Sequence, residues 1–172
     1  LNDAALAEES FRKALQINPQ ASSVQHNLGW MLCQQGRMAE SSRQFLAAIA
    51  EPTYVDKAKS WMAMGVCQAK AGQAAEAEAS LQRAYELDAS SPVTGYNLAL
   101  VLFQRGDYVR SQFYIRRVNN GDLANAESLW LGIKVERRLG NRDAVAQLAG
   151  QLSKRFPQSK EVGLFERGAF DE

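Results

Sequence analysis

Apolar residues recur at steps of three and four along three stretches of the chain, and each stretch ends at a glycine. The stretches read HNLGWMLCQQG, WMAMGVCQAKAG and YNLALVLFQRG, at residues 26–36, 61–72 and 96–106. This spacing places the apolar side chains on one face of a helix. A glycine can adopt the left-handed conformation that closes such a helix. The pattern therefore predicts three amphipathic helices that end at these glycines.

Each predicted helix is followed by a second one with a small-large-small pattern. Small side chains let two helix backbones approach, while the large one fills the space beside them. Gly29, Gly65 and Gly132 lie inside the first helices, where a glycine costs about 1 kcal/mol of helix propensity. We therefore expect a neighbouring helix to pass close to these glycines. The small-large-small positions are Ala7, Phe11 and Ala14; Ser41, Phe45 and Ala48; Ala77, Leu81 and Ala84; and Ser111, Ile115 and Val118.

The unit of two helices repeats along the chain. Gly36, Gly72, Gly106 and Gly140 are separated by 36, 34 and 34 residues. The last repeat is degenerate, because Gly140 lies one residue further from the preceding helix glycine than its counterparts do. We place the repeats at 22–55, 58–91, 92–124 and 125–157, with 1–19 as the second helix of a truncated repeat and 160–172 as a capping segment.

These units are expected to form one domain over residues 1–172. Stacked helix pairs bury a continuous core between neighbours, so the predicted fold is all-α, a right-handed superhelical stack of antiparallel helix pairs. The helix at 1–19 has no partner, so we expect the chain to be a fragment of a longer protein.

The repeats resemble the tetratricopeptide repeat (TPR) family, whose period is about 34 residues. The family pattern is W-x2-L-G-x2-Y, then A-x3-F, then P. Repeat 58–91 shows Trp61, Met64, Gly65, Gly72, Ala77, Leu81 and Ala84, and repeat 22–55 shows Leu28, Gly29, Leu32, Gly36, Phe45 and Ala48. The resemblance implies an α-solenoid that holds another protein and has no catalytic role.

A narrower resemblance covers residues 7–161. The segments NAESLWLGIK (125–134), NRD (141–143) leading to QL and RFP (151–157), and PTY (52–54) resemble the type IV pilus biogenesis proteins of the PilF/PilW type. That family consists of outer-membrane lipoproteins that act as pilotins for the secretin channel. The resemblance implies an adaptor on the periplasmic face of the outer membrane whose partner is a secretin subunit or another pilus-assembly component. The family's lipidated N-terminal cysteine is absent from this chain, and any membrane attachment is expected only through such an anchor.

The net charge and the motifs of the sequence limit the classes of function that we expect. The formal net charge is +1, which gives no electrostatic reason to expect a nucleic acid partner. His26 is the single histidine, and it has neither a metal-binding nor a nucleophile motif around it. Phosphate-binding glycine motifs are missing as well. We therefore expect no cofactor, no metal site and no enzymatic activity.

Cys33 and Cys67 are the two cysteines, and both lie on first helices of adjacent repeats. Their positions within the repeat differ by two, which suggests that they point in different directions. We therefore favour buried free thiols over a disulfide.

In TPR domains the second, fifth, ninth and twelfth positions of each repeat line the concave groove, and these offsets share one helix stripe. Here they are Ser23, His26, Trp30 and Cys33; Lys59, Met62, Val66 and Ala69; Val93, Tyr96, Leu100 and Phe103; and Ala126, Leu129, Ile133 and Glu136. The sixth position adds an asparagine in two repeats, which commonly bonds the backbone of a bound peptide. The predicted partner-binding groove comprises His26, Asn27, Trp30, Lys59, Met62, Val66, Tyr96, Asn97, Leu100 and Phe103.

Packing against the next repeat is the alternative explanation for any one of these residues. The stripe as a whole favours binding, because aromatic and methionine side chains are typical interface anchors. The alternative function is a general peptide-binding TPR co-chaperone, or an assembly adaptor of another complex, that binds peptide ends through Asn27, Lys59 and Asn97. A signal peptide ending in a lipobox ahead of residue 1 would favour the pilus adaptor.

Overall fold

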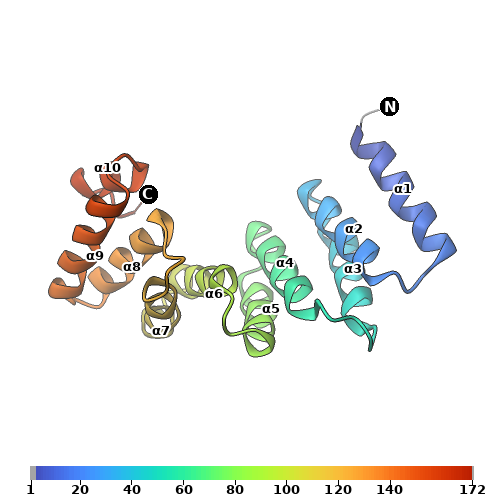
Figure 1. Cartoon of the computed structure of the whole chain (residues 1–172), viewed down its shortest axis with the longest axis horizontal. Helices are drawn as coiled ribbons and strands as arrows, with labels where there is room; N and C mark the ends of the chain where they lie inside the picture. The colour runs from blue at the N-terminus through green and yellow to red at the C-terminus, as the bar shows by residue number, and fades with distance from the viewer. Residues whose placement is uncertain (1–2, 172) are drawn as a thin grey trace. The chain divides into compact units, whose positions relative to one another are not determined.

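Helices account for all the regular structure in the part of the chain that the computed structural model describes, residues 3–171 (Figure 1). The all-α fold that the sequence predicts is confirmed. The helices are α1 (Asp3–Ile17), α2 (Ser22–Gln34), α3 (Met38–Ala50), α4 (Lys57–Lys70), α5 (Ala74–Leu87), α6 (Pro92–Gln104), α7 (Tyr108–Asn119), α8 (Ala126–Arg138), α9 (Arg142–Arg155) and α10 (Lys160–Glu166).

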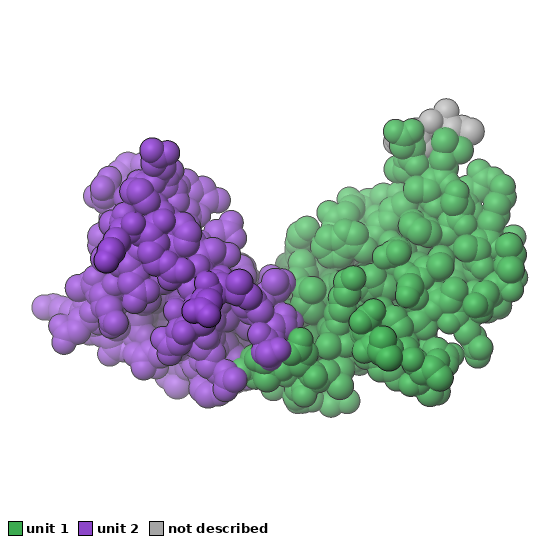
Figure 2. Space-filling view, in the orientation of Figure 1, with its two compact units in different colours: residues 1–89 green, residues 90–172 purple. Residues whose placement is uncertain are grey.

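The chain divides into two compact units (Figure 2). Unit 1 is residues 1–89 and contains the hairpins α2–α3 and α4–α5, with α1 packed on α2. Unit 2 is residues 90–172 and contains the hairpins α6–α7 and α8–α9, with α10 packed on both α8 and α9. In each unit the first helices of adjacent hairpins also contact one another, α2 with α4 and α6 with α8.

The four first helices of the hairpins end in the same way. Each closing glycine has a φ between 75° and 80°, as the sequence predicts. The residue after each glycine donates its amide to a carbonyl five residues back, as Arg37 N does to Leu32 O at 2.9 Å. This pairing satisfies a carbonyl that the helix end would otherwise leave free, and it turns the chain into the second helix.

Within the hairpins the two backbones approach closely at the helix glycines. A Cβ built on Gly65 would lie 2.6 Å from Leu81 Cγ and 3.2 Å from Ala77 O. The close approach that the sequence predicts is therefore confirmed at this position. In the α2–α3 hairpin the small residue opposite the glycine makes a bond as well, because Ser41 Oγ donates to Gly29 O at 2.7 Å.

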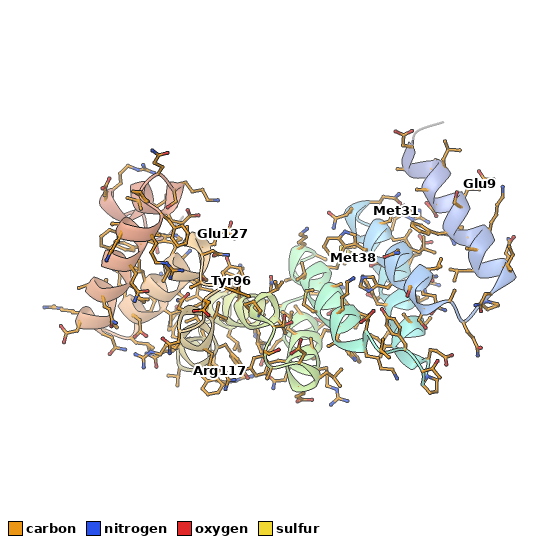
Figure 3. The ribbon with its side chains drawn as sticks, viewed as in Figure 1. Glu9, Met31, Met38, Tyr96, Arg117 and Glu127 are labelled. Atoms are coloured by element: carbon orange, nitrogen blue, oxygen red, sulfur yellow. A yellow bond between two sulfur atoms is a disulfide. The ribbon has the colours of Figure 1, made fainter. Side chains whose placement is uncertain are left out.

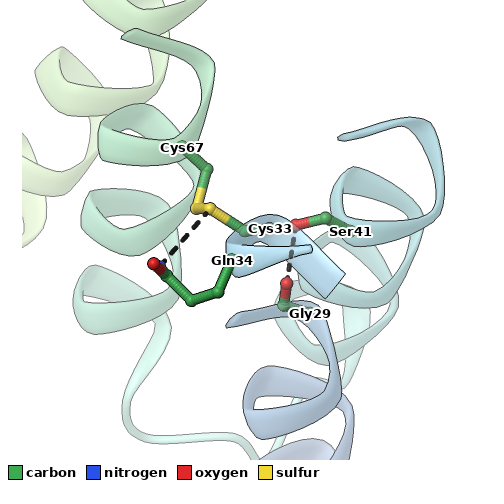
Figure 4. The surroundings of a disulfide bond; sticks show 5 residues. All are labelled: Gly29, Cys33, Gln34, Ser41 and Cys67. Carbon is green, nitrogen blue, oxygen red and sulfur yellow. Dashed lines mark hydrogen bonds between the residues drawn. A yellow bond between two sulfur atoms is a disulfide. The ribbon is translucent and has the colours of Figure 1, made fainter. Parts of the chain in front are cut away.

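The two cysteines form a disulfide (Figure 4). Cys33 on α2 and Cys67 on α4 have Cα atoms 5.9 Å apart, so the sequence-based preference for free thiols is wrong. Two neighbouring helices meet through opposite flanks. Residues that touch across such an interface must therefore occupy different repeat positions, and the offset of two brings the sulfur atoms together.

A tail after α10 folds back onto unit 2. Val162 of α10 joins a core cluster with Leu129, Ile133 and Leu152, and the flanking apolar side chains of 164–170 pack against the same cluster. Gly168 has a φ of 67°, which allows the chain to reverse there. The open end of the α8–α9 hairpin is thereby covered.

Replacing Gly65 by alanine should destabilise unit 1. The added methyl group would displace Leu81, which is fully buried, so we expect a loss of about 1–3 kcal/mol in the free energy of unfolding. Gly150, inside α9, is the control because a Cβ there meets nothing within 4 Å. Gly150→Ala should stabilise unit 2 by about 0.5–1 kcal/mol. Urea unfolding followed by circular dichroism measures both, and equal effects of the two substitutions would contradict the packing argument.

Reduction of the disulfide should also lower the stability of unit 1. The bond closes a loop between cysteines 34 residues apart, which corresponds to about 3–4 kcal/mol in the free energy of unfolding. Urea unfolding with and without reductant measures the loss, and a Cys33→Ala/Cys67→Ala double variant should show no response to reductant. The unreduced chain should weigh about 2 Da less than the reduced one. Two alkylatable thiols in the unreduced chain would refute the pairing.

Candidate functional site

Unit 1 presents an open face on α2 and α4. We call this the α2–α4 face and define it as Asn27, Trp30, Lys59, Met62 and Val66. Trp30 is 40% exposed, and Met62 and Val66 are half-buried. A contiguous patch of partly exposed apolar and aromatic side chains is a candidate protein-binding surface. The sequence predicted all five as groove residues, and the structure places them on these two helices, available for contact.

A lysine that the sequence analysis did not select also belongs to this face. Lys70 Nζ lies over the Trp30 ring, 5.5 Å from its centroid. An ammonium above an indole is attracted by the ring's electron-rich face. The only sequence signal for this contact is that Lys70 stands at the end of the first helix in the next repeat.

His26 lies in the packing between α2 and α4 and not on the open face. It is 8% exposed, its Nδ1 is 2.8 Å from Ser60 Oγ, and its ring meets that of Phe45 edge to face. Tyr54, from the loop before α4, reaches the same serine oxygen at 3.1 Å. The expectation that His26 contacts a partner is therefore corrected, because the ring is already covered by neighbours.

Burial lowers the pKa of His26 below its usual range. The nearby Lys59 lowers it further, whereas Asp56 has the opposite effect. The imidazole is therefore held in its neutral form, as a link between two helices.

Unit 2 contains a cleft of about 490 Å³. Its lining comes from three helices: Tyr96 and Leu100 of α6; Glu127, Trp130, Leu131 and Lys134 of α8; and Lys160, Glu161, Gly163 and Leu164 of α10, followed by Arg167. Figure 3 shows Tyr96 and Glu127 near each other, on the side of unit 2 away from Arg117. Of the groove residues predicted in unit 2, Tyr96 and Leu100 line this cleft.

The other two predicted residues of unit 2 lie on the same helix, α6. Phe103 is half-buried and its ring meets that of Tyr108 at 5.4 Å between centroids. Asn97 donates through Nδ2 to Val93 O at 2.8 Å, so its amide nitrogen is engaged within α6. Phe103 remains available to a partner, and Asn97 offers chiefly its carbonyl oxygen.

Lys134 is the central charged group of the cleft. Its Nζ lies 5.6 Å from the Phe103 ring centroid and 5.7 Å from that of Trp130. Burial lowers its pKa, and Asp171 opposes that shift. Burial likewise raises the pKa of Tyr96, with Glu127 and Glu161 adding to the effect. The cleft therefore combines an apolar lining with charges that are partly withdrawn from water.

The groove positions predicted on α8 are wrong by one residue. Leu129, Ile133 and Glu136 are buried, and Ala126 packs against the core that the first two form. The exposed or half-buried positions of α8 lie one residue later, at Glu127, Lys134 and Arg137. Trp130 is on the same stripe and lines the cleft, but its side chain is buried. The closing glycine explains the shift, because Gly140 follows Gly132 at one residue more than the usual spacing. Counting back from each closing glycine aligns these residues with the groove positions predicted in the other three repeats.

Glu136 is a structural carboxylate. Its oxygens accept hydrogen bonds from Arg116, Gln112 and Asn141 at 2.6–2.8 Å. Burial raises its pKa, but these hydrogen bonds outweigh that effect and leave the pKa below its usual range. The group joins α7, α8 and the start of α9, so it holds three parts of unit 2 together.

Metal-binding clusters and membrane-spanning helices are two further features that bear on function. No group of three or more metal-ligating side chains capable of holding an ion occurs within residues 3–171. In that same part of the chain, none of the helices has the length and apolar character needed to cross a membrane.

Several known proteins are similar to this chain in sequence or in structure. The tetratricopeptide repeat family matches residues 1–21 and 58–91. The type IV pilus assembly protein PilF of Pseudomonas aeruginosa is 27% identical over 161 residues, which is 94% of this chain and 64% of PilF. The chain thus spans a little under two thirds of the length of this curated relative.

Two solved structures of pilus proteins are also similar to this chain. PilW, described as a widely conserved type IV pilus biogenesis factor, has 34% identity and a TM-score of 0.81, with 91% of this chain and 72% of PilW covered. The structure of Pseudomonas aeruginosa PilF has 26% identity and a TM-score of 0.81, with 96% of this chain and 80% of that one covered.

The helical hairpins define a TPR scaffold. Within that class, the chain belongs to the PilF/PilW family of type IV pilus biogenesis factors. Type IV pilus biogenesis is associated with the cell envelope.

The stability of unit 1 should fall with pH below about 6.5, the ordinary pKa of histidine. The folded chain holds His26 neutral, so the unfolded chain binds a proton first as the pH decreases. Stability is then lost until the pH falls below the folded-state pKa. Urea midpoints between about pH 7.5 and pH 5.5 measure this, and His26→Gln should flatten the slope, because His26 is the only histidine. An unchanged slope in that variant would contradict the assignment.

Proposed function

We propose that this chain is the protein-binding part of a pilus-assembly adaptor that assists secretin assembly or localisation at the outer membrane, as a pilotin does. The observation that carries the proposal is that the first helices of both units leave apolar and aromatic side chains partly exposed. These are Trp30, Met62 and Val66 in unit 1 and Phe103 in unit 2. Membership of the PilF/PilW family supplies the biological setting, since those relatives are named for pilus assembly and biogenesis.

The proposed location is the periplasmic face of the outer membrane. The Cys33–Cys67 disulfide supports an oxidising compartment, because such bonds persist in the periplasm and are rare in the cytosol. It also weighs against the cytosolic co-chaperone alternative. Membrane attachment is proposed through a lipidated N-terminal cysteine of the longer protein, as the family resemblance implies.

The proposed partner is a secretin subunit that lays an apolar helix or an extended segment on these faces. Trp30 of unit 1 and Phe103 of unit 2 supply large aromatic surfaces that are partly open. Such anchors carry a large share of the binding energy at protein interfaces. Lys59, which is exposed on the α2–α4 face, is the single cation that a peptide-end clamp in unit 1 could use among the predicted groove residues, so an apolar segment is favoured.

Trp30→Ala and Phe103→Ala should each weaken secretin binding by about tenfold or more, through loss of a buried aromatic anchor. Titration calorimetry with the purified secretin domain measures the affinity, and circular dichroism should show unchanged helicity. Phe113→Ala is the matched control, because Phe113 is 56% exposed on α7, a second helix. If both variants bind as tightly as the parent chain, the partner does not use these faces.

A further inference from the structure

We propose that residues 168–171 form a strap that occupies the α8 part of the binding surface of unit 2, so that a protein partner must displace the strap to reach α8. The inference rests on the proposed function and adds a regulatory contact to it. The strap follows α10, and the side chains that it contacts all belong to unit 2.

The strap lies where a partner is expected on the last repeat. Counted back from the closing glycine, Glu127, Trp130, Lys134 and Arg137 of α8 align with the groove positions of the other repeats. We call these four residues the α8 stripe. On α6 the residues at the same positions are exposed or half-buried. On α8 the strap covers part of the stripe.

Phe170 makes the main contact of the strap. Its ring stacks on that of Trp130, with 5.4 Å between centroids and 23° between planes. The guanidinium carbon of Arg137 lies 3.8 Å from the Phe170 centroid. Trp130 is only 5% exposed, whereas Trp30 in unit 1 is 40% exposed. A ring that meets both an indole and a guanidinium resembles the aromatic anchor of a protein interface, so Phe170 takes the place of a partner's side chain.

Asp171 adds a charged contact beside this ring. Its Oδ1 accepts a hydrogen bond from Arg138 Nη2 at 2.9 Å. Burial lowers the pKa of Lys134, and the negative charge of Asp171 opposes that shift, so the carboxylate also acts on the ammonium of the stripe. The strap therefore satisfies the cations at this end of α8 as well as the apolar surface of Trp130.

The strap is held weakly enough to be displaced. Gly168 reverses the chain with a φ of 67°, and Ala169 N donates to Leu164 O at 2.9 Å. After Ala169 the contacts with α8 described above are made by side chains. The side chains of Arg138 and Asp171 are 50% and 89% exposed, and an ion pair at such a surface contributes little to stability. One ring and one exposed ion pair form a smaller contact than a whole helix or extended segment of a partner.

A closed strap lowers the apparent affinity of unit 2 for a segment that crosses α8. Only chains with an open strap can bind such a segment there, so the measured dissociation constant rises by the inverse of the open fraction. A short tether holds the strap at an effective concentration of roughly millimolar order, so even a weakly binding strap closes a large share of the chains.

A peptide with the sequence of the strap tests its occupancy without any partner. In NMR spectra of the isotope-labelled full chain, the peptide RGAFD should shift the Trp130 indole N–H signal of a Phe170→Ala/Asp171→Asn double variant. At the same peptide concentration the parent signal should shift far less, because its own strap fills the site. The peptide RGAAN should shift neither signal. A Trp130→Phe variant assigns the resonance.

Titration calorimetry with the purified secretin domain measures the effect on a partner. The double variant should bind about threefold or more tightly than the parent chain. Phe113→Ala/Glu166→Gln is the matched control, because it also removes one ring and one carboxylate, both exposed and outside the strap contacts. Its affinity should equal that of the parent. Asp171→Asn alone changes only an exposed side chain, so it should fold and give a smaller gain in the same direction.

Two results would overturn the inference. If RGAFD shifts the Trp130 signal equally in the parent and the double variant, or in neither, the strap does not occupy the α8 stripe. If secretin binding by the folded variants is unchanged or weaker, the partner does not compete with the strap. Absence of secretin binding in every chain would contradict the proposed function, and the peptide result would then decide the inference by itself.

Discussion

The close crossing of two helices inside each hairpin is the constraint on which the rest of the structure depends. At Gly65 the α5 helix is so near that a single methyl group would collide with Leu81. On α4 that contact accompanies the burial of Met64 and Gly65. Met62 and Val66, on the other side of the helix, stay partly exposed. The open faces of both units are therefore consequences of packing, and their residues can be identified once the buried side is known.

The closing glycine fixes how each first helix is turned. A left-handed residue ends the helix and directs the chain into the second helix, so the side chains that face the core are set by their distance from that glycine. This is why the sequence predicted the hairpins correctly, and why the groove positions that it predicts on α6 are exposed or half-buried. On α8 the extra residue before Gly140 rotates the stripe by one position, and alignment on Gly132 missed it. Trp130 and Lys134 were overlooked for that reason alone.

The repeat pattern alone could not predict which residues of neighbouring first helices contact one another. The His26–Ser60 contact and the Cys33–Cys67 disulfide both join residues 34 apart, whereas the closing glycines of these two repeats are 36 apart. Both links therefore connect positions that differ by two, because α2 and α4 meet through opposite flanks. The sequence shows where an apolar stripe lies on each helix. It does not show which flank of that stripe the next helix covers, and His26 was assigned to the open side on that account.

Each unit places a lysine ammonium over an aromatic ring. Lys70 lies over Trp30 in unit 1, and Lys134 lies over Phe103 and Trp130 in unit 2. An interaction face must be apolar to bind well, yet it has to remain soluble while it is empty. A lysine over a ring meets both requirements, because its ammonium adds charge to the face and is attracted by the electron-rich face of the ring.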